Sequence, residues 1–242
     1  HLMRYSSRYV LPYVADHTLE RELSRTQLVL SISDTHSTFL DPFTWEVFLC
    51  ACRDLKPDII IANGDVLEGS EISRFPKIPG WTVPLQLEFD FAREMFRQLR
   101  AVAPHARIVW SAGNHGLDRF AAYLTQVAPA LANLRSLRFD ELAGVKDLGI
   151  ELAQGGSIMS PAGTEDEKPG RMLGGFYYVH HGVKLGENPA LAELRSVGHS
   201  GQSGHVHRAS VAYGTTLAHA GLTWMSTPMG CTHRAGRSYM KG

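Results

Sequence analysis

The stretch Ile59-Ile60-Ile61-Ala62-Asn63-Gly64-Asp65-Val66-Leu67-Glu68 decides how the chain is organised. It begins with an apolar run whose length and branched side chains predict a fully buried strand. Gly64 allows a sharp turn directly after this run, so the Asp65 carboxylate is expected to face outward from the end of the sheet. A single Gly-Asp pair after a strand is most often an ordinary turn. The interpretation therefore depends on whether the pattern recurs.

Metal-ligand residue types cluster in the same way at four other places. The segments are Asp34-Thr35-His36, Gly113-Asn114-His115, His180-His181-Gly182 and Gly204-His205-Val206-His207. Strands are expected at 27–33, 108–111 and 176–179, directly before the first three segments. A lone His after a strand is usually a hydrogen-bonded surface or core residue. Five such clusters in one chain make unrelated structural explanations implausible and favour a shared metal site.

The composition of the chain limits which folds and which partners are expected. The 242 residues, of which 44% are hydrophobic, predict a single α/β domain at 26–242 after an N-terminal arm at 1–25. Basic and acidic residues balance at 24 each, so net charge predicts no long electrostatic contact with duplex nucleic acid. The sequence shows no membrane span and no signal peptide, which predicts a cytoplasmic protein without a membrane partner. Cys50, Cys52 and Cys231 are interpreted as buried thiols without a metal or redox role.

The first half of the chain predicts parallel βαβ units. A helix at 42–55 is expected to begin with Asp41 as its cap and to bury a stripe that includes Phe43 and Leu55. A second helix is expected to bury Leu87, Phe91, Met95 and Leu99, which recur every four residues. Both are interpreted as right-handed crossovers between parallel strands.

The second half of the chain has a different pattern of apolar residues. Short apolar runs at 149–152, 176–179, 211–213 and 222–225 predict a second, more antiparallel sheet, and the acidic run at 164–168 is interpreted as a solvated loop. The loop at 69–84, which leaves the Asp65 turn, is the expected substrate-facing segment, with a surface loop whose aromatic side chains pack on the core as the alternative. Within it Arg74 is predicted to bind a phosphate oxygen, with a surface salt bridge as the alternative.

The five motifs, taken in order over residues 27–209, resemble the calcineurin-like metallophosphoesterase superfamily. The resemblance implies an α/β fold, a four-layer α-β-β-α sandwich of two mixed β-sheets flanked by helices, with a two-metal site at the strand ends. It implies that Asp65 bridges two ions. The implied ligands are Asp34, His36 and His207 for one ion, and Asn114, His181 and His205 for the other. His180 is the alternative to His181, and Asn114 is also expected to contact the substrate.

The residue types indicate the chemistry that such a site supports. Imidazole, carboxylate and amide ligands suit two divalent transition-metal ions, with manganese favoured and iron, zinc, cobalt or nickel as alternatives. Two such ions can generate a metal-bound hydroxide that attacks a phosphate ester. His115, beside a predicted ligand, is predicted to be the general acid for the leaving oxygen, and Glu68 to orient it.

Two departures from the superfamily pattern concern the substrate. Glu68 stands where the family carries an aspartate, and Gly116 stands where the phosphatase branch usually carries an acidic residue. Asp118-Arg119, the segment 73–76 and the ending at 231–239 resemble phage-encoded members. This resemblance favours a phosphodiester of a nucleotide or nucleic acid. A phosphomonoesterase acting on proteins or small metabolites is the alternative, followed by a non-catalytic scaffold, and the oligomeric state is not indicated.

Overall fold

The computed structural model describes residues 27–77, 80, 82–153, 170–173, 177–215 and 221–232. The predicted arm at 1–25 and the acidic run at 164–168 lie outside these residues. The division into an arm and one domain at 26–242 therefore stays a prediction.

The first sheet contains four strands, all paired in parallel. It consists of β1 (Val29–Ile32), β2 (Ile59–Ala62), β3 (Arg107–Ser111) and β4 (Ile150–Ala153), in the order β1-β2-β3-β4. Helices α3 (Pro42–Leu55) and α4 (Leu85–Val102) connect β1 to β2 and β2 to β3, which confirms the predicted βαβ units. The expectation of two mixed sheets is wrong for this sheet. The expectation that the run at 149–152 joins the second sheet is also wrong, because β4 pairs with β3.

The helix faces differ in part from those predicted. Asp41 caps α3 as expected, since its Oδ1 accepts a hydrogen bond from the Thr44 N–H at 2.8 Å. The predicted buried stripe of α3 is wrong: Phe43 is 79% exposed, and the helix instead buries Trp45, whose Nε1 donates to Gln98 Oε1 at 2.7 Å. The large ring with its hydrogen bond to α4 faces the core in place of the stripe.

Helix α4 follows its predicted stripe except at its start, since Phe91 is partly buried against the core. Met95 and Leu99 are buried as predicted, whereas Leu87 is exposed and its neighbour Glu88 is fully buried. The first turn of α4 is therefore rotated away from the orientation that apolar spacing predicts, with a carboxylate facing inward.

The second sheet is mixed. It consists of β5 (Arg171–Leu173), β6 (Tyr177–Val179), β7 (Ser200–Ser203), β8 (Ser210–Gly214) and β9 (Leu222–Ser226), in the order β5-β6-β7-β9-β8. The two outer pairs are antiparallel, and the two inner pairs are parallel. The sequence pattern did not predict β7, because its residues Ser-Gly-Gln-Ser form no apolar run. This strand leads into the Gly204 segment and joins β6 to β9.

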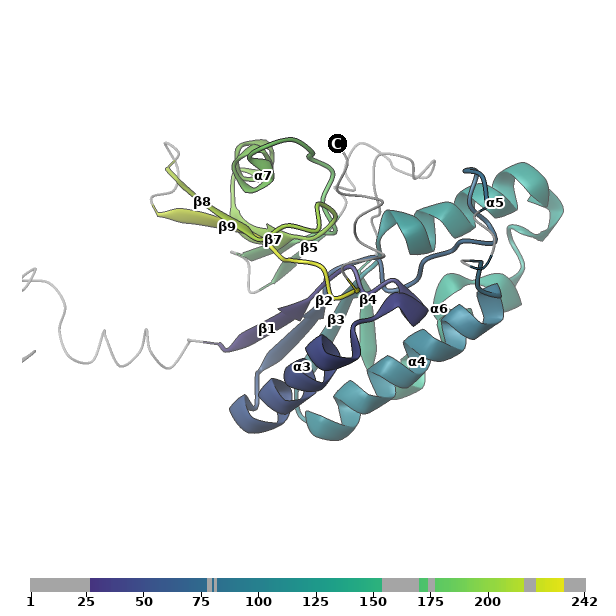
Figure 1. Ribbon diagram of the computed structural model, residues 1–242, viewed down its shortest axis with the longest axis horizontal. Coiled ribbons are helices and arrows are strands. Elements are labelled where there is room, and N and C mark those ends of the chain that lie inside the picture. Colours follow the sequence, from purple (N-terminus) through teal and green to yellow (C-terminus); the bar gives the residue numbers. More distant parts are fainter. Residues whose placement is uncertain are drawn as a thin grey trace, which may run out of the picture.

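The helices and the two sheets are stacked in four layers (Figure 1). Successive side chains of a strand point to opposite faces of its sheet, so each sheet can pack on both sides. Ile60 of β2 packs in the core beneath α3 and α4, whereas Ile59 and Ile61 face the second sheet and pack with Val179. Helix α7 (Pro189–Val197) covers the outer face of the second sheet, where its Leu194 packs with Trp224. The predicted α/β four-layer arrangement is confirmed, with one parallel and one mixed sheet.

Shorter elements complete the first half of the fold. The longest are a π-helical turn η2 (Asn114–Asp118), α5 (Arg119–Val127) and α6 (Phe139–Ala143), and the single 3₁₀ turns are η1 (Ser37–Phe39), η3 (Pro129–Leu131), η4 (Arg135–Leu137) and η5 (Lys146–Leu148). After β9 the chain returns to the end of β1 through isolated bridges that pair Ser33 with Met229 and Leu40 with Cys231.

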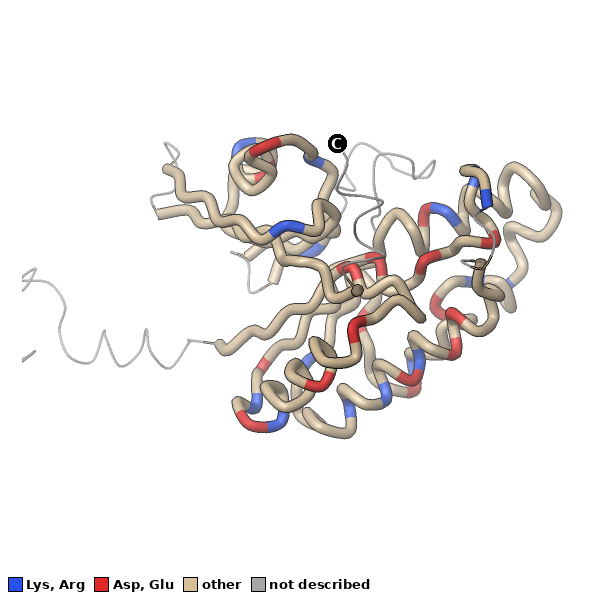
Figure 2. The backbone as a smooth tube through the Cα atoms, viewed as in Figure 1, with Lys and Arg blue, Asp and Glu red and all other residues tan. Residues whose placement is uncertain are grey.

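Charges of both signs are interspersed along the helices of the described chain, and acidic segments also gather where the strands of the first sheet end (Figure 2). None of the helices in the described residues has the length and apolar character needed to cross a bilayer.

Candidate metal centre

The predicted ligands lie on turns at the strand ends, and their backbone is unusual. Seven non-glycine residues of the described chain have a positive φ, and five of them are predicted metal ligands: Asp34 (52°), His36 (50°), Asp65 (45°), His205 (70°) and His207 (58°). Left-handed backbone costs a non-glycine residue of order 1–3 kcal/mol and is concentrated at functional sites. The turn that carries Asp34 and His36 is left-handed at both of these residues.

One group of ligand atoms forms around the end of β1. His36 Nε2 lies 3.3 Å from His207 Nε2, and His207 Nε2 lies 3.2 Å from Asp34 Oδ1. All three side chains are buried. The structure therefore brings together the three residues predicted for one ion.

A second group lies at the ends of β2, β3 and β6. His181 Nε2 lies 3.0 Å from Asp65 Oδ2 and 3.1 Å from Asn114 Oδ1. The His205 ring stands edge-on to the His181 ring, with 5.1 Å between their centroids. These are the residues predicted for the other ion.

Asp65 belongs to both sides of the site. Its carboxylate lies within 4.8 Å of ligand atoms of His36 and His115 in one group, and of His181 and His205 in another. Its Oδ1 also accepts a hydrogen bond from the His115 N–H at 2.9 Å. A single carboxylate between two sets of imidazoles is the arrangement that a bridging ligand needs.

The spacing of these atoms fits divalent ions. Two ligand atoms that each lie about 2.1 Å from one ion are separated by roughly 3.0–3.4 Å at octahedral or tetrahedral angles. The four contacts between ligand atoms given above measure 3.0, 3.1, 3.2 and 3.3 Å. These nitrogen and oxygen atoms converge at the spacing of ligands around one ion, so this donor set fits the ions that the sequence predicts.

Two motif glycines make room for these ligands. A Cβ atom on Gly64 would lie 1.9 Å from Nδ1 of His181, and one on Gly113 would lie 2.0 Å from Oδ1 of Asp65. The glycine of one motif thus accommodates a predicted ligand from another segment of the chain. This close approach gives a physical reason for the Gly-Asp and Gly-Asn-His sequences.

A comparison with protein families now identifies the chain. The model of the calcineurin-like phosphoesterases matches residues 28–208. The chain belongs to the calcineurin-like phosphoesterase family. Members are hydrolases that act on phosphate esters, and the family implies divalent metal ions. None of the curated proteins compared with the chain matches it.

In this calcineurin-like phosphoesterase, carboxylates and imidazoles perturb one another strongly. Burial alone would raise the pKa of Asp65, but the neighbouring His181 and His115 hold it well below its usual value. Burial alone would lower the pKa of His181, but the carboxylate of Asp65 raises it to about 10. The proton on His181 thus offsets the negative charge of the neighbouring Asp65 carboxylate, and a bound cation would displace this proton.

Glu68 stands between the metal residues and the predicted acid. Its Oε2 lies 2.7 Å from His36 Nδ1 and 3.2 Å from His115 Nδ1. Burial opposes ionisation, but hydrogen bonds with His115 and His36 hold the pKa of Glu68 far below its usual range. The structure therefore places the Glu68 carboxylate where it contacts His115 as predicted, and also His36, which the sequence did not indicate.

The two adjacent histidines that follow β6 diverge. His181 faces Asp65, whereas His180 Nε2 lies 3.2 Å from Glu193 Oε2 on α7 and its ring stands edge-on to Trp224. The placement favours His181 as the ligand, which stays a prediction.

Arg74 lies apart from these contacts. Its side chain is exposed, and its guanidinium carbon is 5.2 Å from the centre of the Phe75 ring. None of the site contacts given above involves Arg74. Arg119, which sequence reasoning gave no role, instead donates from Nη1 to the Glu68 carbonyl at 2.6 Å.

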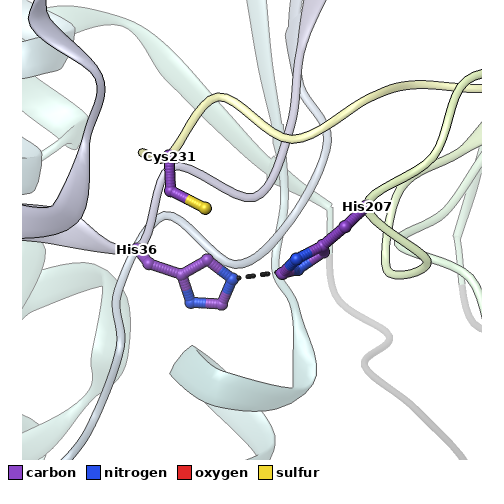
Figure 3. Close-up of side chains that lie close together, drawn as sticks. All are labelled: His36, His207 and Cys231. Carbon is purple, nitrogen blue, oxygen red and sulfur yellow. Dashed lines mark hydrogen bonds between the residues drawn. The ribbon is translucent and has the colours of Figure 1, made fainter. Parts of the chain in front are cut away.

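Cys231 is a further neighbour that the sequence analysis did not place at the site. Its Sγ and ring nitrogens of His36 and His207 all lie within 4.8 Å of one another, and Figure 3 shows the three side chains around one space. It is buried as predicted, and burial raises the pKa of its thiol to about 12. No sequence signal links Cys231 to the histidines, because it follows no motif and is brought to them by long-range pairing, which includes the bridges of Met229 to Ser33 and of Cys231 to Leu40.

Proposed function

We propose that this chain hydrolyses a phosphodiester of a nucleotide or nucleic acid, with two divalent transition-metal ions, manganese first among them. One observation carries the two-ion proposal: Asp65 lies between two groups of ligand atoms, each at ion-ligand spacing. When bound, the ions supply Lewis-acid polarisation of the phosphoryl group and activation of a water nucleophile. In this proposal Asp34, His36 and His207 hold one ion, and Asn114, His181 and His205 hold the other.

The protein's own groups supply the remaining chemistry. His115 is proposed to donate the proton to the leaving oxygen, because a buried imidazole beside the Glu68 carboxylate is held in one orientation. Asn114 is proposed to contact both an ion and the substrate. The predicted cytoplasmic location is kept as part of the proposal.

The preference for a diester rests on the resemblance to phage-encoded members and on Gly116, where the phosphatase branch carries an acid. The phosphomonoesterase remains the alternative within the same family. The test compares bis(4-nitrophenyl) phosphate with 4-nitrophenyl phosphate at equal Mn²⁺, followed by single-stranded DNA, RNA and dinucleotides. A higher kcat/KM for the diester supports the proposal, and hydrolysis of the monoester alone would replace it with the phosphomonoesterase.

The choice between the adjacent histidines makes a prediction about metal binding. His181→Ala should bind one ion per chain in place of two, because it removes an imidazole beside Asp65 and Asn114. His180→Ala is the matched control: it removes the neighbouring imidazole, which faces Glu193, and should keep both ions. Calorimetric titration with Mn²⁺ counts the sites, and the reverse pattern would show that His180 is the ligand.

Arg74 gives a second prediction. If its exposed guanidinium binds a phosphate oxygen, Arg74→Ala should raise KM for a phosphodiester by about 10-fold, the value of one charge-assisted hydrogen bond. Arg53→Ala removes the same charge from an exposed position on α3 and should leave KM unchanged. Steady-state kinetics on several diesters measures KM for both variants. Equal KM values for the two variants would show that Arg74 does not bind the substrate.

A further inference from the structure

Glu88 is a buried carboxylate outside the predicted metal and acid residues. It lies in the first turn of α4 and has no exposed surface. Its Oε2 accepts hydrogen bonds from the N–H groups of Glu68 and Gly69, both at 2.7 Å, and its Oε1 accepts from the Ser70 N–H at 3.4 Å. Three consecutive backbone donors therefore converge on one carboxylate, as in an anion-binding nest.

The same carboxylate also binds the turn after β1. The Ser37 hydroxyl donates to Glu88 Oε2 at 3.1 Å, and the Ser37 N–H donates to the Val66 carbonyl at 2.6 Å. Ser37 directly follows His36. Glu88 thus connects the turn that carries His36 with the turn that carries Glu68.

The backbone held by Glu88 has little freedom. Gly69 has a φ of +60°, and a Cβ atom on it would lie 2.5 Å from the His115 carbonyl oxygen. An unpaired buried carboxylate is costly, and so are buried N–H groups without acceptors. Glu88 and the segment 68–70 therefore depend on each other, and Glu88 holds the backbone from which the Glu68 side chain projects.

We propose that Glu88 is a positioning residue that fixes the Glu68 carboxylate between His36 and His115. Its kinetic consequences rest on the proposed function, whereas its structural consequence does not. Glu88 does not contact the substrate in this account; it acts through Glu68.

Two substitutions separate the hydrogen bonds of Glu88 from its charge. Glu88→Met keeps a similar volume but removes the acceptors for the Glu68 and Gly69 N–H groups. Glu88→Gln keeps an oxygen at the Oε2 position and loses the charge, so it should restore most of the function. Glu193→Met is the matched control, because Glu193 on α7 is equally buried and its Oε1 accepts from the Val183 and Lys184 N–H groups at 2.7 and 2.8 Å.

The first measurement uses the ion-free protein and needs no substrate. The contact of 2.7 Å between His36 Nδ1 and Glu68 Oε2 should give a downfield, exchange-protected ring proton in the NMR spectrum of histidine-labelled protein. The signal is assigned by its loss in His36→Gln. It should be absent in Glu88→Met and present in both Glu88→Gln and Glu193→Met. Its persistence in Glu88→Met would overturn the proposal.

The second measurement is a double-mutant cycle on a phosphodiester with an alkyl leaving group. Alone, Glu88→Met should lower kcat/KM by about 10- to 100-fold, the usual effect of losing a group that orients a site residue. In the Glu68→Gln background the further loss should be no more than about twofold, because the carboxylate that Glu88 positions is gone. Glu193→Met should have the same effect in both backgrounds. Equal losses from Glu88→Met with and without Glu68→Gln would show a purely structural role.

A folding defect has its own control. If thermal unfolding shows that Glu88→Met does not fold, Ser37→Ala is tested in its place. This variant removes one hydrogen-bond donor to the Glu88 carboxylate, so the ring-proton signal should be weaker than in the parent protein. If no phosphoester is hydrolysed but the ring proton behaves as expected, the proposed function fails and the positioning role stands. If hydrolysis occurs and the ring proton does not respond to Glu88, the positioning role fails alone.

Discussion

Asp65→Asn is expected to lower kcat/KM on phosphoesters by more than about 100-fold, since even changes to groups that only orient a metal ligand cost about 10- to 100-fold. Asp65 is within reach of His36 and His115 on one side and of His181 and His205 on the other. Asparagine has nearly the same shape but offers one neutral oxygen. It therefore weakens the attraction for both proposed ions and also disturbs the hydrogen bond from the His115 N–H.

Asp58→Asn is the matched control for this variant. Asp58 precedes β2 at the opposite end of the strand, where its Oδ2 accepts a hydrogen bond from the Leu28 N–H, which an amide oxygen can also accept. Its activity should be close to that of the parent protein. Full turnover and two bound ions in Asp65→Asn, measured by kinetics and calorimetric titration, would refute the bridging role.

The loss of activity in His115→Ala is expected to depend on the leaving group of the substrate. General acid catalysis is typically worth roughly 100- to 10,000-fold, so the variant should lose activity in that range on an alkyl phosphodiester, whose alkoxide needs a proton. It should lose little on a nitrophenyl ester, whose phenolate does not. Glu68→Gln should show the same dependence more weakly, because the carboxylate 3.2 Å from His115 Nδ1 orients the ring.

His105→Ala provides the comparison for His115. His105 is exposed and precedes β3 at the opposite end of the strand from His115, so its removal should change neither rate. The kcat/KM values on a matched pair of alkyl and nitrophenyl esters decide the matter, with ion binding checked in parallel. Equal losses on both esters with the ions retained would mean that His115 positions the substrate and is not the acid.

Much of the first half of the fold could be predicted from sequence, because its strands are buried on both faces. The run at 59–62 is apolar throughout since Ile60 faces helices while Ile59 and Ile61 face the second sheet. The α3 cap was also evident, because Asp41 and Pro42 are local signals.

The errors arise where tertiary contacts override local pattern. Phe43 lies on an apolar stripe of α3, yet Trp45 packs inward with a hydrogen bond to α4. Strand β7 has no apolar signature, because its small and polar residues meet Trp224: a Cβ atom on Gly201 would lie 2.7 Å from the Trp224 ring, and the Ser203 hydroxyl accepts a hydrogen bond from Trp224 Nε1 at 3.0 Å. The run at 149–152 is short and apolar like the strands of the second sheet, so its sequence predicts that sheet, whereas β4 pairs with β3 of the first sheet.

Some residues of the candidate site could likewise be predicted from sequence, and others could not. Histidines and carboxylates that follow strands could be placed at one edge from their order alone, since parallel strands end together. Glu88 could not, because a carboxylate in an amphipathic helix has the pattern of a solvent-facing residue. Its partners are backbone N–H groups of the segment 68–70, which carry no sequence signal.

We expect two ions bound around Asp65 to give this chain its phosphoesterase activity. The most direct measurement strips the protein of metal and then adds Mn²⁺ stepwise, while bound ions per chain and hydrolysis of bis(4-nitrophenyl) phosphate are followed in the same samples. We expect no hydrolysis in the stripped protein, saturation at two ions per chain, and activity that rises with the second ion. Saturation at one ion, or hydrolysis that persists without metal, would contradict it.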